Sequence, residues 1–338
     1  ISSFRSRLHE IYYKTNYDDT SVYRTTFQLG AIWNILPGLV LKPTAYYFGT
    51  EGIENYFQAD NETTGNTIRP ASAKHNYDRH LQGDLVLSYD KKIKEHNIGA
   101  VAGASYTHDY SYRLSASGSG SSIDLIPTLN ATADSTQRAS STKTMEATLS
   151  YFGRVNYDYD NKYFLGLSYR VDGSSRLQRS HRWGNFWSLG TSWRIDRESF
   201  MASTSDWLSA LTLKMSYGAQ GNDNLGTYYA SKGLYSIVSN LGENALVSDR
   251  MATPNLKWET NLNFNVGIDF SLFNNRFSGS FDFFTRRSKD LLYSRPIAPS
   301  LGYGSIDENV GALKNTGIEM VLNGTIINQN GWVWKLGM

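Results

Sequence analysis

The 338-residue sequence contains no cysteine. Disulfide bridges, thiol nucleophiles and cysteine-based zinc sites are therefore excluded for this chain. The composition fits an envelope protein that avoids the thiol chemistry of an oxidising periplasm, and many cytosolic proteins share it.

Long apolar runs and clusters of one charge are also missing. No run approaches the roughly 18 apolar residues of a membrane-spanning helix. The formal net charge is only +2, and no Lys/Arg cluster is long enough to indicate nucleic-acid binding. We therefore expect no nucleic acid among the partners.

Motifs that carry chemistry are absent as well. The six histidines show no close metal-ligand spacing. There is no Walker-type phosphate loop and no G-x-S-x-G nucleophile elbow. The sequence thus predicts no catalytic residue, no metal and no cofactor, and we expect a protein that is not an enzyme.

The sequence is instead rich in aromatic residues, and apolar and polar residues alternate in it with a period of two. It contains 23 Tyr, 8 Trp and 29 Gly, and Tyr and Trp favour positions where one end of the ring is dry and the other wet. From 262 to 272 every second residue is apolar, and the alternation resumes at 277 after Asn274-Asn275. Such alternation predicts strands with one dry and one wet face.

The same pattern predicts about thirteen strands, most of them longer than the usual 5–6 residues. They lie near residues 3–13, 21–33, 38–48, 80–90, 96–109, 144–158, 163–172, 185–195, 210–219, 258–272, 276–288, 315–327 and 331–338. The only short helix is expected around Glu198–Trp207.

Short and long connections alternate along the chain. The long ones are 49–79, 110–143, 173–184, 220–257 and 289–314. Because a meander puts consecutive connections at opposite ends of its sheet, all long loops fall at one end, as in outer-membrane barrels. Within them, residues 113–141 are rich in Ser and Gly and are expected to form a mobile surface loop. The alternative fold is a soluble antiparallel sandwich or propeller, which usually has shorter strands.

Charged residues on the wet face are expected to point into the lumen, because Arg or Lys facing lipid near the midplane costs about 2–4 kcal/mol. The candidates are Arg154, Arg170, Lys214, Asp269 and Glu319. Three roles are open for these residues: the wall of a water channel, the wall against which a plug domain packs, or a solvated surface without further function.

Aromatic residues of the long loops are the candidates for ligand contact, since aromatic faces stack on sugars and pack against peptide side chains. They are Tyr110, Tyr112, Trp183, Tyr228, Tyr229 and Tyr303. The alternative for each is a place in the interfacial aromatic girdle or in loop packing.

Several stretches resemble the SusC/RagA family of TonB-dependent outer-membrane transporters. They include YFGRVNYDYDNKYFLGLSYRVDGSSR at 151–176, TPNLKWETNLNFNVGIDFSLFNNRFSGSFDFFTRRSKDLL at 253–292 and GYGSIDENVGALKNTGIEM at 302–320. The resemblance covers about 151–338; before it, the comparison rests on strand pattern and order.

The resemblance implies a barrel of 22 strands filled by an N-terminal plug, and a TonB box that couples the protein to TonB–ExbB–ExbD. It also implies a SusD-like surface lipoprotein that captures oligosaccharides or peptides, an arrangement typical of Bacteroidetes. The sequence shows neither plug nor TonB box, and an odd strand count cannot close a bacterial barrel of this type. We therefore expect residues 1–338 to be part of the β-barrel domain.

The expected function is active import across the bacterial outer membrane, energised through TonB. Two alternatives stay open at this point. One is a siderophore or small-chelate receptor, and the other is a structural or secretion-associated barrel.

Overall fold

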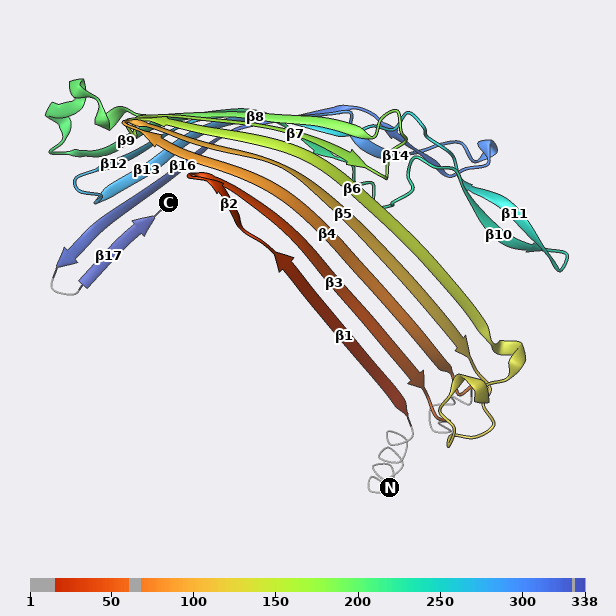
Figure 1. Cartoon of the computed structure of the whole chain (residues 1–338). Coiled ribbons are helices and arrows are strands. Elements are labelled where there is room, and N and C mark those ends of the chain that lie inside the picture. The colour runs from red at the N-terminus through yellow and green to blue at the C-terminus, as the bar shows by residue number, and fades with distance from the viewer. Residues whose placement is uncertain (1–15, 61–67, 330–331, 338) are drawn as a thin grey trace. The chain divides into compact units, whose positions relative to one another are not determined.

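The computed structural model describes residues 16–60, 68–329 and 332–337, and almost all of its regular structure is antiparallel strand (Figure 1). The main sheet has 13 strands in the order β1-β3-β4-β5-β6-β7-β8-β9-β12-β13-β16-β17, with β2 paired to β3. Its strands are β1 (Tyr17–Gly30), β2 (Trp33–Leu36), β3 (Leu39–Phe57), β4 (Ala71–Ile93), β5 (His96–Gly118), β6 (Arg138–Tyr159), β7 (Tyr163–Ser174), β8 (Trp183–Arg194), β9 (Leu208–Asn222), β12 (Glu259–Leu272), β13 (Phe277–Lys289), β16 (Ala312–Gln329) and β17 (Trp332–Gly337).

Two further hairpins lie within the long connections. They are β10 (Leu234–Asn240) with β11 (Glu243–Arg250), and β14 (Leu292–Pro296) with β15 (Ser305–Asn309). The short helices are all of the 3₁₀ type: η1 (Leu129–Ala131), η2 (Asp134–Thr136), η3 (Ile195–Arg197), η4 (Ser199–Thr204) and η5 (Pro299–Leu301). In the part of the chain that the structure describes, no helix combines the length and apolarity needed to cross a membrane.

The predicted all-β antiparallel meander is confirmed, and several element boundaries differ. The expected strand at 3–13 lies outside the described residues. β4 and β5 each run for 23 residues, well beyond the expected ranges 80–90 and 96–109. Residues 113–118 and 138–141 belong to β5 and β6, so the segment expected as a mobile loop shortens to 119–137.

The short helix expected around Glu198–Trp207 is confirmed over residues 199–204, where it is of the 3₁₀ type. Isolated helices this short are marginal, and Ser and Thr side chains compete for the backbone hydrogen bonds. The Thr204 hydroxyl donates to the Met201 carbonyl oxygen at 2.8 Å, an example of that competition.

The chain divides into two compact units. One comprises the described parts of 1–30, 44–83 and 107–147, and the other 31–43, 84–106 and 148–338. In the first unit, Phe57 and Ala59 are fully buried, Ala71 is almost so, and Leu129 packs against them. The end of β3, the start of β4 and the connection between β5 and β6 therefore share one small core.

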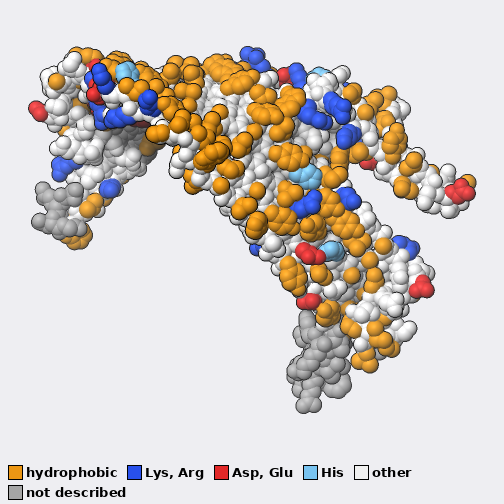
Figure 2. Space-filling view, viewed as in Figure 1, with side chains coloured by type: hydrophobic (Ala, Val, Ile, Leu, Met, Phe, Trp, Pro, Cys, Tyr) orange, Lys and Arg blue, Asp and Glu red, His pale blue; other side chains and the backbone are white. Residues whose placement is uncertain are grey.

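In the second unit the register sorts side chains of β6–β9, β12, β13 and β16 onto two faces, because residues paired directly opposite one another share a face. We call one the apolar face; a representative row is Tyr157, Leu165, Thr191, Met215, Val266, Phe283 and Ile318. The adjacent row lies on what we call the polar face: Asp158, Phe164, Ser192, Lys214, Gly267, Asp282 and Glu319. Figure 2 shows hydrophobic side chains exposed along the strands on the side turned to the viewer.

The short turns have the backbone that tight hairpins need. Asp160 and Asn161 join β6 to β7 with φ values of 51° and 50°, and Asn274 and Asn275 between β12 and β13 have φ values of 55° and 64°. Positive φ at both central residues matches the twist of the flanking strands, and Asn and Asp tolerate it better than most residues. The residue types at these positions thus explain the short turns between the strands.

Aromatic residues frame the apolar face at both ends of β7. At the short-turn end Tyr163 stacks on Trp193 with ring centroids 6.3 Å apart, and at the other end Tyr151 stacks on Trp183, also at 6.3 Å. Ten residues separate the two paired positions on β7, Tyr163 and Gly173. They span about 33 Å along the strand, or about 25 Å of height at a tilt of about 40°, which matches the apolar band of outer-membrane barrels.

The carboxylate of Glu198 anchors the aromatic row at the short-turn end. It accepts hydrogen bonds from the Tyr163 hydroxyl and from Trp193 Nε1, the latter at 3.0 Å. These two bonds hold the pKa of the Glu198 carboxyl below its usual value. The polar tips of two apolar-face rings thereby find partners beside the strand ends, as interfacial aromatics do.

Candidate functional site

The polar face of the second unit carries the five charged residues that the sequence pattern selected. Arg154 pairs with Ser168, Arg170 with Phe152 and Phe186, Lys214 with Gly267 and Ser192, Asp269 with Ser280 and Thr212, and Glu319 with Asp282. None of them shares a face with the apolar rows. The polar face is therefore one continuous surface that runs across seven strands.

An ion-pair cluster crosses three strands of this face. Lys214 Nζ lies 2.7 Å from Asp269 Oδ1 and 3.1 Å from Asp282 Oδ1. Gly267 stands between Lys214 and Asp282 in the row, and a Cβ there would lie 2.1 Å from Asp282 Oδ1 and 2.8 Å from Lys214 Cε. The glycine leaves the space in which the lysine reaches across β12 to the second carboxylate.

Hollows on the polar face are large enough for a solute or for side chains of another domain. One of about 740 Å³ lies toward the short turns and is lined by Lys92, Arg154, Asn156 and Asp158 among others. A second of about 460 Å³ is lined by Ser188, Gln220, Asn263 and Arg286 among others. Both lie in the size range of protein sites for small molecules.

Aromatic residues on the polar face were missed by the sequence reasoning. The ring of Phe186 meets that of Trp258 edge to face, with centroids 5.3 Å apart, and Trp258 Nε1 donates to the Arg182 carbonyl oxygen at 2.9 Å. Gly184 and Gly221 make room, since a Cβ at either would lie within 2.4 Å of Phe186 Cζ. The alternation along β8 is the sequence signal that could have found Phe186. Phe186 is an odd number of positions away from both Trp183 and Trp187, so its side chain lies on the opposite face from theirs.

Four of the six loop aromatics that were candidates for ligand contact belong to the second unit. Trp183 lies on the apolar face against Tyr151, a placement that favours the girdle over ligand contact. In the same unit the guanidinium carbon of Arg176 is 5.1 Å from the Tyr228 ring centroid, and Lys232 Nζ is 5.3 Å from that of Tyr229.

The remaining three candidates also have partners of their own. The Tyr303 hydroxyl shares a hydrogen bond of 2.8 Å with the Ser248 hydroxyl. Tyr110 and Tyr112 belong to the first unit, where Tyr110 meets Tyr77 edge to face at 6.1 Å and Tyr112 meets His75 at 6.5 Å.

The long connections of the second unit fold together into what we call the loop cluster, formed by residues 174–182, 223–258 and 289–311. Leu177, Ala230 and Leu256 form its buried core, each about 2% exposed, and Leu225, Trp258 and Leu292 pack against them. Figure 1 shows β10, β11 and β14 at this end of the unit's strands, opposite the short turns. The loops at this end are therefore ordered by a core of their own.

Polar contacts tie the third segment of the loop cluster to the second. Arg250 Nη1 donates to Asp307 Oδ2 at 2.9 Å, and Asp307 is buried. The Asn309 side chain accepts from the Lys257 N–H and donates to the Lys257 carbonyl oxygen, both at 2.9 Å. A hollow of about 410 Å³ lies beside these contacts, lined by residues 252–257, Asp290 and 306–309.

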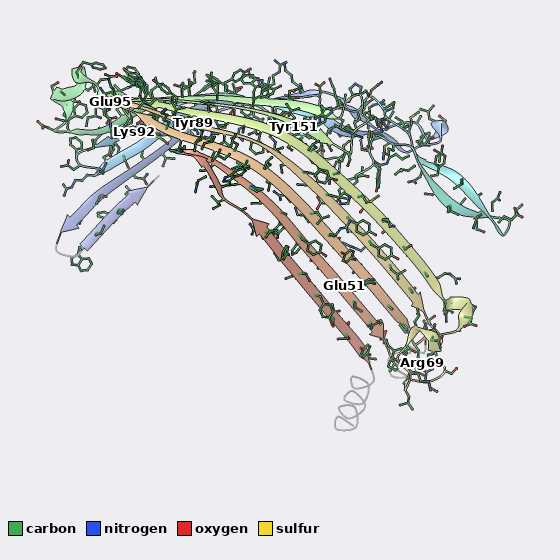
Figure 3. All side chains as sticks on the ribbon, viewed as in Figure 1. Glu51, Arg69, Tyr89, Lys92, Glu95 and Tyr151 are labelled. Carbon is green, nitrogen blue, oxygen red and sulfur yellow. The ribbon has the colours of Figure 1, made fainter. Side chains whose placement is uncertain are left out.

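The first unit has its own organised loop, centred on Arg69 (Figure 3). Arg69 Nε donates to Asp124 Oδ1 at 2.7 Å, Nη2 to Asp60 Oδ2 at 2.8 Å and Nη1 to the Ser121 carbonyl oxygen at 3.2 Å. The Asp60 N–H also donates to Asp124 Oδ1, at 3.0 Å. These contacts tie Ser121 and Asp124 of the loop 119–137 to Asp60 and Arg69, and the expected mobility of this loop stays a prediction.

Acid is expected to open this loop. Burial raises the pKa of the Asp124 carboxyl, but the hydrogen bonds from the Asp60 N–H and from Arg69 outweigh burial, and the pKa lies below its usual value. A carboxyl with a depressed pKa stabilises the folded loop at neutral pH, and this stabilisation is lost as the pH falls through the folded pKa, below about pH 4. Hydrogen-exchange protection of residues 119–137, corrected for intrinsic rates, should drop below that pH in the natural protein.

The Asp124→Asn variant provides the control for this prediction. It should show the reduced protection already at pH 7 and little further change on acidification. Equal protection of both proteins at pH 7 would contradict the role given to Asp124.

Comparison with known proteins identifies a family and several relatives. The sequence profile of the family described as TonB dependent receptor-like, β-barrel, matches residues 2–338. The TonB-dependent receptor P3 of Formosa agariphila is 29% identical over 319 residues, which are 93% of this chain and 32% of that protein. The TonB-dependent receptor SusC of Bacteroides thetaiotaomicron is 31% identical over 201 residues, 57% of this chain and 20% of that protein.

Solved structures show the same similarity. The structure of the RagAB peptide transporter matches 95% of this chain and 36% of its own chain, with a TM-score of 0.87 and 28% identity. The ferric-catecholate import receptor Fiu of Escherichia coli matches 93% of this chain and 46% of its own, with a TM-score of 0.53 and 10% identity, which shows a shared fold alone. The chain spans between a fifth and a third of the length of the two curated relatives.

Proposed function

Because this chain belongs to the TonB dependent receptor-like β-barrel family, we propose that it forms part of the barrel wall of an importer for oligosaccharides or peptides. The protein is a β-barrel receptor of the bacterial outer membrane and not an enzyme. The proposal adds the class of solute and the direction of movement. It also assigns residues 1–338 to the barrel domain of a longer protein.

The observation that carries the proposal is the polar face. Seven strands present Lys214, Asp269, Asp282, Glu319 and Arg154 on one side and an apolar surface on the other. A wall with lipid on one side and water on the other needs this division. In the proposed transporter the polar face lines the lumen and contacts a plug domain or the passing solute.

The proposed partners are a SusD-like surface lipoprotein that captures solute and the TonB–ExbB–ExbD complex that supplies energy. The relation to SusC and to the RagAB peptide transporter supports this choice, because the identity reaches 31% and 28% respectively. Similarity to the ferric-catecholate receptor is 10% in sequence, so it gives no comparable support to a siderophore function. The loop cluster is the proposed surface that meets the captured solute.

Uptake by cells tests the proposal. Deletion of the gene for the full-length protein should abolish uptake of one class of labelled oligosaccharide or peptide, and the intact gene should restore it. Collapse of the proton-motive force should stop uptake in complemented cells to the same extent. Loss of iron-chelate uptake alone would favour the siderophore alternative, and unchanged uptake of every solute would favour a structural barrel.

A pair of single-cysteine variants tests which face of the strands contacts lipid. The chain has no natural cysteine, and Ile318 and Glu319 are neighbours on opposite faces of β16. A fluorophore attached at Ile318→Cys should be strongly quenched by brominated lipids in reconstituted vesicles. The same fluorophore at Glu319→Cys should be quenched little, and equal quenching at both positions would contradict a polar lumen face.

A further inference from the structure

The apolar face of the second unit contains a hollow of about 590 Å³ near the short turns. Large apolar side chains border it, and small residues form its floor. The bordering residues are Leu39, Leu87, Tyr89, Val155, Leu167 and Tyr169; the floor includes Ala100, Ala102 and Gly153. The volume lies in the range of sites that hold a small molecule.

The glycine in this floor is not required by packing. A Cβ at Gly153 would meet only the Val101 carbonyl oxygen, at 3.8 Å, which is an ordinary contact. At Gly103, by contrast, which lies on the polar face of β5, a Cβ would lie 2.6 Å from the Phe152 ring. The small residue at 153 therefore keeps a space open on the surface that faces lipid.

Two lysine side chains, Lys91 and Lys94, lie beyond the end of this hollow that is nearer the short turn. Asp90 faces the polar side, since its Oδ1 lies 3.1 Å from where a Cβ of Gly99 would be. Tyr89 and Lys91 consequently share the apolar face, with Lys91 about 7 Å further toward the turn. Lys94 follows in the turn itself, and both lysines are exposed (Figure 3 marks Tyr89 and Glu95 at this end).

We propose that this hollow binds an acyl chain of an anionic phospholipid from the leaflet at the short-turn end, with Lys91 holding the phosphate. An outer-membrane barrel has lipid against its apolar face, so hydrocarbon is what fills a dry hollow there. A lysine at the edge of the apolar band lies at headgroup depth and attracts negative lipid charge. The site is independent of which solute the protein carries.

Lipid retention tests the proposal. The full-length protein, reconstituted in phosphatidylethanolamine bilayers that contain phosphatidylglycerol, should retain phosphatidylglycerol preferentially when extracted and examined by native mass spectrometry. Lys91→Glu should lower that preference at least about fivefold, the change expected from losing one cationic side chain at the surface. Lys92→Glu is the matched control, because Lys92 alternates onto the polar face, and it should leave retention unchanged.

A second variant tests the hollow itself. Ala102→Trp should displace the retained lipid of either headgroup, whereas Leu213→Trp, elsewhere on the apolar face, should not. Two results would overturn the proposal. One is that the natural protein shows no headgroup preference. The other is that Ala102→Trp does not change lipid retention although gel mobility shows the variant to be folded. Conversion of a dimer to a monomer by Ala102→Trp with lipid retention unchanged would instead assign the hollow to contact between copies.

Discussion

Replacing Val266 with arginine is expected to prevent most of the protein from assembling in the outer membrane. Val266 lies at the middle of β12 on the apolar face, between Met215 of β9 and Phe283 of β13. An arginine on the lipid side costs about 2–4 kcal/mol at the midplane, a factor of about 30 to 1000 in the folding equilibrium. The heat-modifiable, folded fraction in isolated outer membranes measures the effect, and denaturant titration in liposomes gives its free energy.

Asn265→Arg is the matched control for this prediction. Asn265 is the preceding residue on β12, and its Nδ2 donates to the Ser216 hydroxyl on the polar face at 3.3 Å. An arginine there remains in water, so we expect a change within about 0.5 kcal/mol, as for most solvated surface positions. Similar losses for both variants would mean that β12 does not separate lipid from water.

The alternating part of the fold could be predicted from the sequence because membrane strands repeat one physical constraint. Between Leu262 and Leu272 every second residue is apolar, and the observed register puts those six residues on one face. For such a segment the period of two is sufficient to predict a strand and its two faces. The same parity would have placed Phe186 on the polar face, where its partner Trp258 comes from a distant loop.

Segments outside the apolar band could not be predicted in this way. The first half of β4 contains Lys74, His75, Asn76 and Asp78, so neither face is apolar and no alternation marks a strand. There the backbone is extended by pairing with neighbouring strands, and residues far away in the sequence provide that pairing. The expected loops at 49–79 and 110–143 were too long for this reason.

The loop cluster lay beyond sequence reasoning for a related reason. Asn309 bonds to Lys257 and Arg250 to Asp307 across 52 and 57 residues of sequence, respectively. Each partner alone is an ordinary polar loop residue. The candidate aromatics were chosen as residue types near the mouth of a barrel, and the structure gives them separate neighbours. Ligand contact by these residues stays a prediction.

Replacing Leu256 with alanine is expected to open the loop cluster and leave the strands folded. Leu256 is 2% exposed and packs with Ala230 of its own segment, 223–258, and with Leu177 of the segment 174–182. Leucine-to-alanine changes in such cores cost about 2–5 kcal/mol. Because loops open locally with free energies below that of the whole protein, hydrogen-exchange protection of residues 174–182 and 225–256 should fall about 30-fold or more.

Leu241→Ala provides the control, since Leu241 is fully exposed at the tip of the β10–β11 hairpin. It removes the same atoms from water instead of from a core, so protection of the loop cluster should not change. If the loop cluster contacts the solute as proposed, uptake by Leu256→Ala cells should fall while the amount of folded barrel stays normal. The core of Leu177, Ala230 and Leu256 would then govern transport by holding the loops in position, without contacting the solute itself. Normal protection in the Leu256→Ala protein would show that polar contacts such as Arg250–Asp307 suffice to hold the loops.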